Sequence, residues 1–399
     1  MTRFVIVGAS AGGLATAEAL RRAGHEGSIT LIGDEPHLPY DRPPLSKQVL
    51  TGQWQPDQLP LRSLADVDAL DLDLRLGSAA AGLDTAERVV VLADGVRVTY
   101  DGLVIATGVR PRRVPGSEGV TGVHTLRTIE DALDLKARLR PGRRLVIVGA
   151  GFVGAEVAAV ANGLGADVTV LEANPVPLAH AVGEQTGRFL AQLHRNRGVR
   201  LRTHAAVAEI LDSRGEVTGV RLTDGGIVPA DDVLMAIGSV PNTDWLRDSG
   251  LPVGNGLLCD EFSAAAPDVY GVGDVACWRN PLFGASMRIE HRTNAAEQGM
   301  TVAHNLLNSE ARRPFAPVPY FWSDQYELKL QAYGHLHGHD QALVLDHPAA
   351  TRWLVAYRTQ DRLTGVLGIG VSPKDLRAWR LLISTRTPWD EAVKSMAAA

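Results

Sequence analysis

The chain has 399 residues, of which 45% are hydrophobic and 21% are charged, and its formal net charge is -5 at pH 7. This length suits two or three domains, and the composition is that of an ordinary globular protein. A negative net charge without any basic block argues against a general nucleic-acid binder. No apolar run reaches the roughly 18 residues that a membrane-spanning helix needs. The N-terminus enters a predicted strand at once, which leaves no room for a signal sequence.

The chain has two cysteines, Cys259 and Cys277. They lie too far apart for a redox CxxC motif, and no Cys/His cluster has the spacing of a zinc site. We therefore expect no metal site, no disulfide framework and a cytoplasmic location. We expect Cys277 to be a small buried side chain.

One pattern occurs twice along the chain, in residues 3–35 and 143–173. Each copy has an apolar strand, a Gly-rich turn, an Ala-rich helix, a glycine, a second strand and an acidic end. Both copies are therefore predicted βαβ units, and their repetition implies two dinucleotide-binding domains.

The segments between and after the repeats complete the predicted organisation. Residues 89–108 read as a hairpin around Asp-Gly followed by a buried strand. Residues 266–276 read as a strand that closes on Gly-Asp, and residues 294–308 as a helix with apolar residues at helical spacing. Residues 110–119 are rich in Pro, Gly and Arg, which is typical of a domain boundary.

The predicted fold is α/β, with two Rossmann-like dinucleotide-binding domains and a C-terminal α+β domain. We predict a discontinuous first domain at 1–109 and 240–312. The second domain, 110–239, is inserted into it, and the C-terminal domain covers 313–399, where short aromatic and β-branched runs begin.

The second Gly-rich turn matches the GxGxxG pattern through Gly149, Gly151 and Gly154. These glycines permit a tight turn, a close approach of pyrophosphate to the backbone, and close packing of the helix on the strand. Glu172 ends the next strand, where a carboxylate can accept hydrogen bonds from both ribose hydroxyls. Ala173 and Asn174 follow, with no arginine to neutralise a 2′-phosphate, so NADH is favoured over NADPH.

The first Gly-rich turn departs from that pattern, because Ser10 replaces the second glycine. Gly8, Gly12 and Gly13 remain, and we expect Gly12 to supply the close approach to phosphate. Asp34 and Glu35 are both candidates for the ribose acid, and spacing does not distinguish them.

Two further signals favour FAD over a second NAD at the first turn. Residues 104–108 return the chain to the side of that turn. Residues 269–274 end in Gly273 and Asp274, where a carboxylate can accept a hydrogen bond from a ribityl hydroxyl. Both signals, in this order around a second βαβ unit, are specific to a flavoprotein layout.

The complete set of motifs resembles the FAD-dependent NADH–ferredoxin reductases of bacterial oxygenase systems, the group that includes putidaredoxin reductase and rubredoxin reductase. The resemblance covers essentially the whole chain and implies a glutathione-reductase-like fold with FAD, NADH and C-terminal domains. The stretches that carry it are PYDRPPLSK (39–47), GAGFVGAE (149–156), GVGD (271–274), RIEH (288–291), NAAEQG (294–299) and FWSDQYE (321–327).

The resemblance adds roles for particular residues. It implies that Lys47 places a cation near the reactive flavin nitrogen, that Glu156 holds the nicotinamide amide and pairs with Lys47, and that Trp322 reaches the flavin face. The role of Arg292 stays open, and His291 beside it is expected to be packed or hydrogen-bonded. The predicted FAD-binding residues are Gly8, Ser10, Gly12, Gly13, Asp34, Glu35, Arg42, Pro43, Lys47, Ala80, Ala106, Thr107, Gly108, Arg127, Gly273, Asp274, His291, Arg292 and Trp322. The predicted NADH-binding residues are Gly149, Gly151, Val153, Gly154, Glu156, Glu172, Ile237 and Gly238.

Ser46 and Lys47 stand where disulfide reductases have redox-active cysteines, so a thiol relay is excluded. Electrons must then leave the flavin directly, and a [2Fe-2S] ferredoxin is the fitting one-electron partner. A direct NADH reductase of quinones or other small acceptors, or a redox-sensing binding protein like apoptosis-inducing factor, are the alternatives. The oligomeric state, monomer or homodimer, is left open. Arginines that can steer an acidic ferredoxin are Arg110, Arg112, Arg113, Arg312, Arg313, Arg377 and Arg380.

Overall fold

The computed structural model describes residues 2–346 and 352–397, which form two compact units. Unit 1 comprises residues 1–41, 59–110 and 240–321, and unit 2 comprises residues 42–58, 111–239 and 322–399. The chain passes from one unit to the other between Asp41 and Arg42, between Gln58 and Leu59, and within the strands β8 (Val109–Pro111), β17 (Ser239–Pro241) and β24 (Tyr320–Gln325).

Unit 1 is built on a mixed sheet with the strand order β20-β21-β7-β1-β2-β3. The strands from β21 to β3 pair in parallel, and β20 pairs antiparallel with β21. Strands β1, β2 and β7 are buried along their whole length, as expected for parallel strands covered on both faces. The strands are β1 (Phe4–Val7), β2 (Ile29–Ile32), β3 (Asp73–Arg75), β7 (Gly102–Ile105), β20 (Ala264–Ala266) and β21 (Val269–Gly271).

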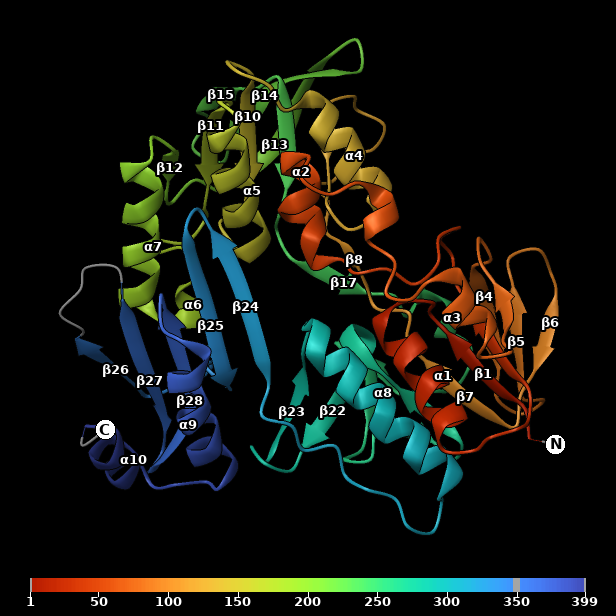
Figure 1. The fold of residues 1–399 in the computed structure, drawn as a ribbon. Helices are drawn as coiled ribbons and strands as arrows, with labels where there is room; N and C mark the ends of the chain where they lie inside the picture. The colour runs from red at the N-terminus through yellow and green to blue at the C-terminus, as the bar shows by residue number, and fades with distance from the viewer. Residues whose placement is uncertain (1, 347–351, 398–399) are drawn as a thin grey trace. The chain divides into compact units, whose positions relative to one another are not determined.

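Helices α1 and α8 lie side by side in unit 1 (Figure 1). The two helices pack closely, since a Cβ added to Gly299 would lie only 2.7 Å from the Gly12 carbonyl oxygen. The predicted helix 294–308 is confirmed, although it begins at Arg292. The helices of this unit are α1 (Ala11–Arg22), α3 (Leu64–Asp68), η3 (Asp244–Leu246), η4 (Gly273–Val275) and α8 (Arg292–Leu307).

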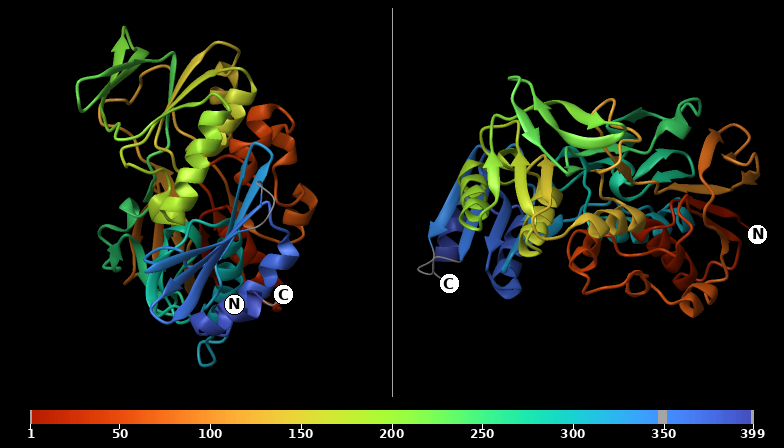
Figure 2. Two further views of the ribbon diagram at one scale, coloured as in Figure 1. Left: turned by 90° about the vertical axis from the view of Figure 1, so that its left-hand side faces the viewer. Right: turned by 90° about the horizontal axis from the view of Figure 1, so that it is seen from above.

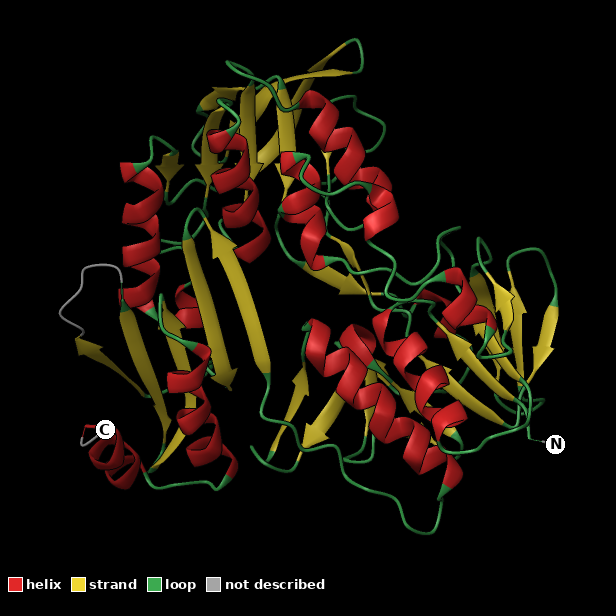
Figure 3. Ribbon diagram, viewed as in Figure 1, coloured by secondary structure: helices red, strands yellow, loops and turns green. Residues whose placement is uncertain are grey.

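Two smaller sheets complete unit 1 (Figure 3). The predicted hairpin at 89–108 is confirmed: β5 and β6 pair antiparallel around Asp94-Gly95, and the chain returns in the buried strand β7. The strands of these sheets are β4 (Ala80–Asp84), β5 (Val89–Leu92) and β6 (Arg97–Thr99), and β18 (Val253–Gly254), β19 (Gly256–Cys259), β22 (Ala276–Asn280) and β23 (Ala285–Arg288).

Unit 2 repeats the βαβ arrangement around β10, in a parallel sheet with the order β12-β11-β10-β16-β9. A three-stranded antiparallel sheet, β13-β14-β15, covers it, and both contribute to one apolar core. The strands are β9 (Val123–His124), β10 (Arg144–Val148), β11 (Asp167–Leu171), β12 (Arg200–Arg202), β13 (Val207–Ser213), β14 (Glu216–Leu222), β15 (Ile227–Pro229) and β16 (Asp232–Met235).

The helices of this part of unit 2 begin at recognisable sequence signals. Thr128 and Asp131 form a capping box at the start of α4, and Gly151 stands at the N-cap of α5. The helices are η1 (Pro43–Ser46), α2 (Gln48–Thr51), η2 (Pro56–Gln58), α4 (Ile129–Arg138), α5 (Phe152–Gly163), α6 (Ala179–Val182) and α7 (Glu184–Asn196).

The C-terminal part of unit 2 is a five-stranded sheet with α9 packed on β25 and β28 (Figure 2). The predicted C-terminal α+β arrangement is therefore present. Its elements are β24, β25 (Leu328–Gly334), β26 (Gln341–Asp346), β27 (Trp353–Thr359), β28 (Arg362–Ile369), α9 (Pro373–Ser384) and α10 (Trp389–Ala397).

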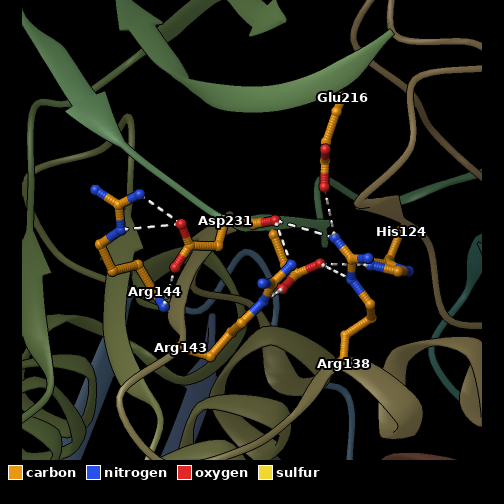
Figure 4. A network of polar contacts seen from close by, with 7 residues as sticks. His124, Arg138, Arg143, Arg144, Glu216 and Asp231 are labelled. Carbon is orange, nitrogen blue, oxygen red and sulfur yellow. Dashed lines mark hydrogen bonds and ion pairs between the residues drawn. The ribbon is translucent and has the colours of Figure 1, made fainter. Parts of the chain in front are cut away.

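A polar cluster at the start of β16 ties the elements of unit 2 together (Figure 4). The buried carboxylate of Asp232 accepts hydrogen bonds from Arg138 Nε at 2.7 Å and Arg143 Nε at 2.6 Å, and it lies 3.3 Å from His124 Nε2. Burial is the largest single influence on the pKa of Asp232 and acts to raise it. The hydrogen bonds from these partners together outweigh burial, so the pKa of Asp232 is lowered. The neighbouring Asp231 pairs with Arg144.

Candidate functional site

The first Gly-rich turn in unit 1 requires glycine at two positions. Gly8 has φ +122°, and a Cβ there would lie 2.1 Å from the Ala106 carbonyl oxygen. A Cβ at Gly13 would lie 2.0 Å from the Gly8 carbonyl oxygen. The segment Ala106–Gly108 therefore lies against the turn at the carboxyl end of β7, as we expected from residues 104–108.

The second Gly-rich turn, in unit 2, has the same backbone form. Gly149 has φ +98°, and a Cβ there would lie 2.4 Å from the Ala236 carbonyl oxygen. A Cβ at Gly154 would lie 2.2 Å from the Gly149 carbonyl oxygen. Ile237 and Gly238 follow Ala236 directly, so the end of β16 lies against this turn.

The comparison of the two turns explains why Ser10 is tolerated. Ser10 stands at the N-cap of α1 and Gly151 at the N-cap of α5, both with extended backbone. A Cβ at Gly151 would have only one neighbour, the Ala236 carbonyl oxygen at 3.9 Å. A small side chain therefore fits this position without disturbing the turn.

Gly12 lies where α1 packs against its neighbours. A Cβ at this position would lie 2.7 Å from Val272 Cγ1, so helix packing by itself requires a glycine here. The approach of Gly12 to a phosphate stays a prediction.

The two candidate ribose acids after β2 differ in their surroundings. Glu35 is partly buried and accepts a hydrogen bond of 2.5 Å from the Tyr40 hydroxyl. Asp34 is exposed. The Glu35 carboxylate is thus engaged within the protein, and this favours Asp34 as the ligand for ribose.

The second glycine signal of unit 1 lies at the end of β21. Gly273 has φ +74°, and its N–H donates to Gln298 Oε1 on α8 at 2.8 Å. This bond joins the Gly273-Asp274 turn to α8, so the residues after β21 and the start of that helix are held together.

The start of α8 carries the two residues whose roles the sequence left open. Arg292 Nε donates to Asp41 Oδ1 at 2.7 Å. The His291 ring packs against Phe321 with 5.0 Å between ring centroids, in agreement with a packed histidine. The pairing of Arg292 with Asp41 gives its side chain a partner within unit 1.

Glu172, in unit 2, is buried and fixed by the turn that it faces. One carboxylate oxygen accepts from the Ala150 N–H at 3.0 Å, and the other accepts from the Asn174 N–H at 2.8 Å and Asn174 Nδ2 at 2.7 Å. The carboxylate is therefore oriented before any ligand arrives.

The predicted pairing of Lys47 and Glu156 is confirmed, with 2.7 Å between Lys47 Nζ and Glu156 Oε2. Their side chains are only 11% and 6% exposed, so this is a buried ion pair. The Ser46 hydroxyl donates to the same oxygen at 2.5 Å. Nearby in the sequence, Arg42 donates to the Arg127 carbonyl oxygen at 2.6 Å, which brings two more predicted residues together within unit 2.

Each unit gathers part of the predicted set. Unit 2 holds all the predicted NADH-binding residues together with Arg42, Pro43, Lys47, Arg127 and Trp322. Pro43 begins the short helix η1, Trp322 lies in β24, and Val153 is exposed on α5. Unit 1 holds the remaining predicted FAD-binding residues, which are Gly8, Ser10, Gly12, Gly13, Asp34, Glu35, Ala80, Ala106, Thr107, Gly108, Gly273, Asp274, His291 and Arg292.

Sequence analysis missed two hydroxyl groups at the Glu156 carboxylate. One is Ser46 and the other is Ser323, whose hydroxyl donates to Glu156 Oε1 at 2.7 Å. For Ser323 the sequence offers one signal: the period of two in FWSDQY places Ser323 and Gln325 on the same face of a strand. For the contact of Ser46 with Glu156 the sequence offers no such signal.

Neither thiol is poised for redox chemistry. Burial raises the pKa of Cys259 to about 12 and also raises the pKa of Cys277. Cys277 is half-buried, not buried as we expected, because its neighbours Ala276 and Trp278 occupy the buried face of the strand β22 and Cys277 points to the other face.

The chain matches the family described as pyridine nucleotide-disulphide oxidoreductase over residues 2–299. It belongs to this family. A second match, described as reductase C-terminal, covers residues 320–396. Membership confirms the predicted fold class and an oxidoreductase with FAD and NAD as its cofactors.

Individual relatives agree with this assignment. The chain is 39% identical over 368 residues to a probable ferredoxin reductase of Castellaniella defragrans, covering 91% of this chain and 89% of the relative. It is 35% identical to the ferredoxin–NAD(+) reductase component of a p-cumate 2,3-dioxygenase system of Pseudomonas putida, covering 98% and 95%. A solved covalent putidaredoxin reductase–putidaredoxin complex matches with a TM-score of 0.93 and 33% identity, covering 100% of this chain and 99% of the other. The predicted resemblance to ferredoxin reductases is therefore confirmed.

No helix within 2–346 and 352–397 is long and apolar enough to span a membrane. Across the same ranges, no group of three or more His, Cys, Asp or Glu side chains is arranged to hold a metal ion.

Proposed function

We propose that this protein is an NADH-dependent, FAD-containing ferredoxin reductase that delivers electrons one at a time to a [2Fe-2S] ferredoxin of an oxygenase system. The observation that carries the proposal is the buried Lys47–Glu156 pair beside Ser46, in the segment where a disulfide reductase needs thiols. The only two thiols of the chain have raised pKa values and lie elsewhere. Electrons therefore pass from the flavin to the partner without a sulfur relay.

The residues present fit both nucleotides. The Gly-rich turns of α1 and α5 leave the first N–H groups of each helix without a side-chain cap, which suits a pyrophosphate. Asp34 and Glu172 are the proposed acids for the two adenosine riboses. Ala173 and Asn174 after Glu172 give no cation for a 2′-phosphate, which supports NADH over NADPH.

The division of labour follows from these positions. Glu156 would accept a hydrogen bond from the nicotinamide carboxamide, and Lys47 holds its carboxylate through an ion pair. FAD held at the first Gly-rich turn would supply a group that takes up an electron pair from NADH and gives up electrons singly. One NADH thus yields NAD⁺, one proton and two reduced ferredoxins.

The three-domain division at 1–109 with 240–312, 110–239 and 313–399 and the remaining site residues stay part of this proposal. All seven candidate docking arginines are exposed, and Arg377 and Arg380 lie one turn apart on α9. We also propose a cytoplasmic location, which the two unpaired thiols support.

Anaerobic stopped-flow mixing tests the function directly. NADH is expected to bleach the flavin much faster than NADPH, and the reduced protein is expected to reduce cytochrome c only after a [2Fe-2S] ferredoxin is added. Fast turnover with quinones alone would contradict the proposal in favour of a small-acceptor reductase. Slow flavin reduction with an NADH-dependent change of oligomeric state would contradict it in favour of a redox-sensing binding protein.

A further inference from the structure

The carboxylate of Glu156 accepts more hydrogen bonds than its ion pair explains. Oε2 accepts from Lys47 Nζ at 2.7 Å and from the Ser46 hydroxyl at 2.5 Å. Oε1 accepts from the Ser323 hydroxyl at 2.7 Å. Glu156 and Ser323 are both buried, so the Ser323 contact is shielded from water.

Ser323 is the first member of a longer chain of contacts inside unit 2. Gln325 Nε2 lies 3.3 Å from Ser323 Oγ, and Gln325 Oε1 lies 3.1 Å from His194 Nε2. The Tyr326 hydroxyl lies 3.0 Å from His194 Nδ1. Ser323, Gln325 and His194 are buried, and the three segments that supply the chain are α5, α7 and β24 with the residue after it.

The carboxylate fixes the direction of every bond in this chain. An ionised Glu156 only accepts, so Ser323 must donate its hydroxyl proton to it, and the Ser323 oxygen then accepts from Gln325 Nε2. The other end of that amide is an oxygen, so His194 must carry its proton on Nε2. His194 Nδ1 is then free to accept from the Tyr326 hydroxyl.

The pKa shifts of His194 and Tyr326 agree with this direction. Burial lowers the pKa of His194, although its hydrogen bond to Gln325 acts the other way, so the ring is neutral near neutral pH. Burial raises the pKa of Tyr326 to about 12, so its hydroxyl keeps the proton that it donates.

We propose that Tyr326, His194, Gln325 and Ser323 form a one-way chain of hydrogen-bond donors that holds the Glu156 carboxylate in position to bind the nicotinamide carboxamide. This inference rests on the proposed function, in which Glu156 receives that group. Ser323 is the positioning residue in contact with Glu156, and the other three set its hydroxyl direction. Donors aligned head to tail polarise one another, which strengthens the last bond to the carboxylate.

The first test measures the dissociation constant of NAD⁺ on the oxidised, FAD-loaded protein by isothermal titration calorimetry. Ser323→Ala is expected to weaken NAD⁺ binding roughly tenfold, because it removes a hydrogen bond to a charged group. Ser323→Thr keeps the hydroxyl on a strand that tolerates a β-branched residue, and it is expected to restore the wild-type value. The matched control is Ser384→Ala. Ser384 is exposed on α9, and its hydroxyl donates to the Leu381 carbonyl oxygen of the same helix.

The second test reads the direction of the chain in the wild-type protein by ¹⁵N NMR of the histidine rings, with His194→Gln to assign the signals. We expect a protonated Nε2 and an unprotonated Nδ1 for His194 at neutral pH. The opposite tautomer, or a doubly protonated ring, would overturn the proposal even if Ser323→Ala did not fold.

Glu156→Gln separates the inference from the function on which it rests. If Glu156→Gln weakens NAD⁺ binding and Ser323→Ala does not, the donor chain is refuted while the role of Glu156 stands. If Glu156→Gln binds NAD⁺ like the wild type, the proposed role of Glu156 fails, and the inference fails with it.

Discussion

Replacement of Glu172 gives the sharpest test of which turn binds which nucleotide. In the structure its two carboxylate oxygens accept three N–H hydrogen bonds, from Ala150 and from Asn174. Glu172→Ala removes these bonds and also the acceptors proposed for the ribose hydroxyls. Hydrogen bonds to a charged group contribute about 1.5–3 kcal/mol each, so the loss of one ribose bond weakens NADH binding by roughly 10- to 100-fold.

Without its bonds to Glu172, the Gly-rich turn loses a support at Ala150, and this adds to the loss of binding. We therefore expect a roughly 100-fold increase in the dissociation constant of NADH for Glu172→Ala. Glu172→Gln keeps the size and one acceptor oxygen, and its increase is expected to be roughly tenfold. The control is Glu209→Ala, which removes an exposed carboxylate of the same unit paired with Arg221.

The assay is the dependence of single-turnover flavin reduction on NADH concentration, combined with the ratio of flavin to protein absorbance after gel filtration. FAD content is expected to stay at the wild-type value, because the first Gly-rich turn belongs to unit 1 and Glu172 to unit 2. Loss of FAD from Glu172→Ala would show that the assignment of the two turns is reversed. An unchanged dissociation constant for NADH would remove Glu172 from the site.

Three further predictions concern stability and backbone geometry. Asp232→Asn leaves Arg138 and Arg143 without their buried counter-ion, so it is expected to lower the free energy of unfolding of unit 2 by about 2–3 kcal/mol and with it the midpoint of urea unfolding. Glu184→Gln, in an exposed pair, is expected to change the free energy of unfolding by less than about 1 kcal/mol. Equal urea midpoints for the two variants would refute the structural role of this cluster. Hydrogen bonds from Arg3 and Arg144 lower the pKa values of Asp101 and Asp231 to about 2, so the stability that they contribute is complete above about pH 4 and is lost as the pH falls towards 2. Partial exposure limits that contribution to about 1 kcal/mol for each carboxylate, and an acid transition that does not shift in Arg144→Gln would contradict it. Gly149→Ala is expected to abolish NADH binding, because its Cβ would meet the Ala236 carbonyl oxygen at 2.4 Å, while Gly151→Ser is expected to keep binding within roughly threefold of the wild type; similar titrations of both variants would refute the argument from the turn.

The sequence was sufficient where local rules decide structure. The apolar runs at β1 and β10 predict buried parallel strands, and the structure has them. The glycine spacing predicts two tight strand–turn–helix connections, and in the structure a Cβ at Gly8, Gly13, Gly149 or Gly154 would clash with the backbone. The end of β2 was less certain, because spacing cannot tell which of two adjacent acids is engaged. The contact between Tyr40 and Glu35 favours Asp34 for the ribose, and that assignment stays a prediction.

The two hydroxyl contacts of Glu156 could not be predicted from the sequence, whereas its pairing with Lys47 was implied by the resemblance to ferredoxin reductases. Ser46 and Glu156 are 110 residues apart, and Ser323 and Glu156 are 167 residues apart. No helical or strand period joins such positions, and a lone serine gives no signal by itself. The packing of the whole segment 42–58 within unit 2, after a strand of unit 1, was not predicted, although the implied pairing of Lys47 with Glu156 pointed to it.

The buried position of Lys47 and Glu156 argues that this pair is kept for chemistry and not for stability. Removing two charges from water costs more than their attraction returns in most folds, and apolar residues of similar size are often at least as stabilising. Here the charge of Glu156 is compensated by one ammonium and two hydroxyls. Such an arrangement fixes a carboxylate in a site shielded from water, which a ligand amide needs and a packed core does not. The donors that surround Glu156 are therefore part of the site. They come from two segments, residues 46–47 and the strand β24, in which Ser46 and Ser323 directly flank Lys47 and Trp322, so these serines matter as much as the two residues that they flank.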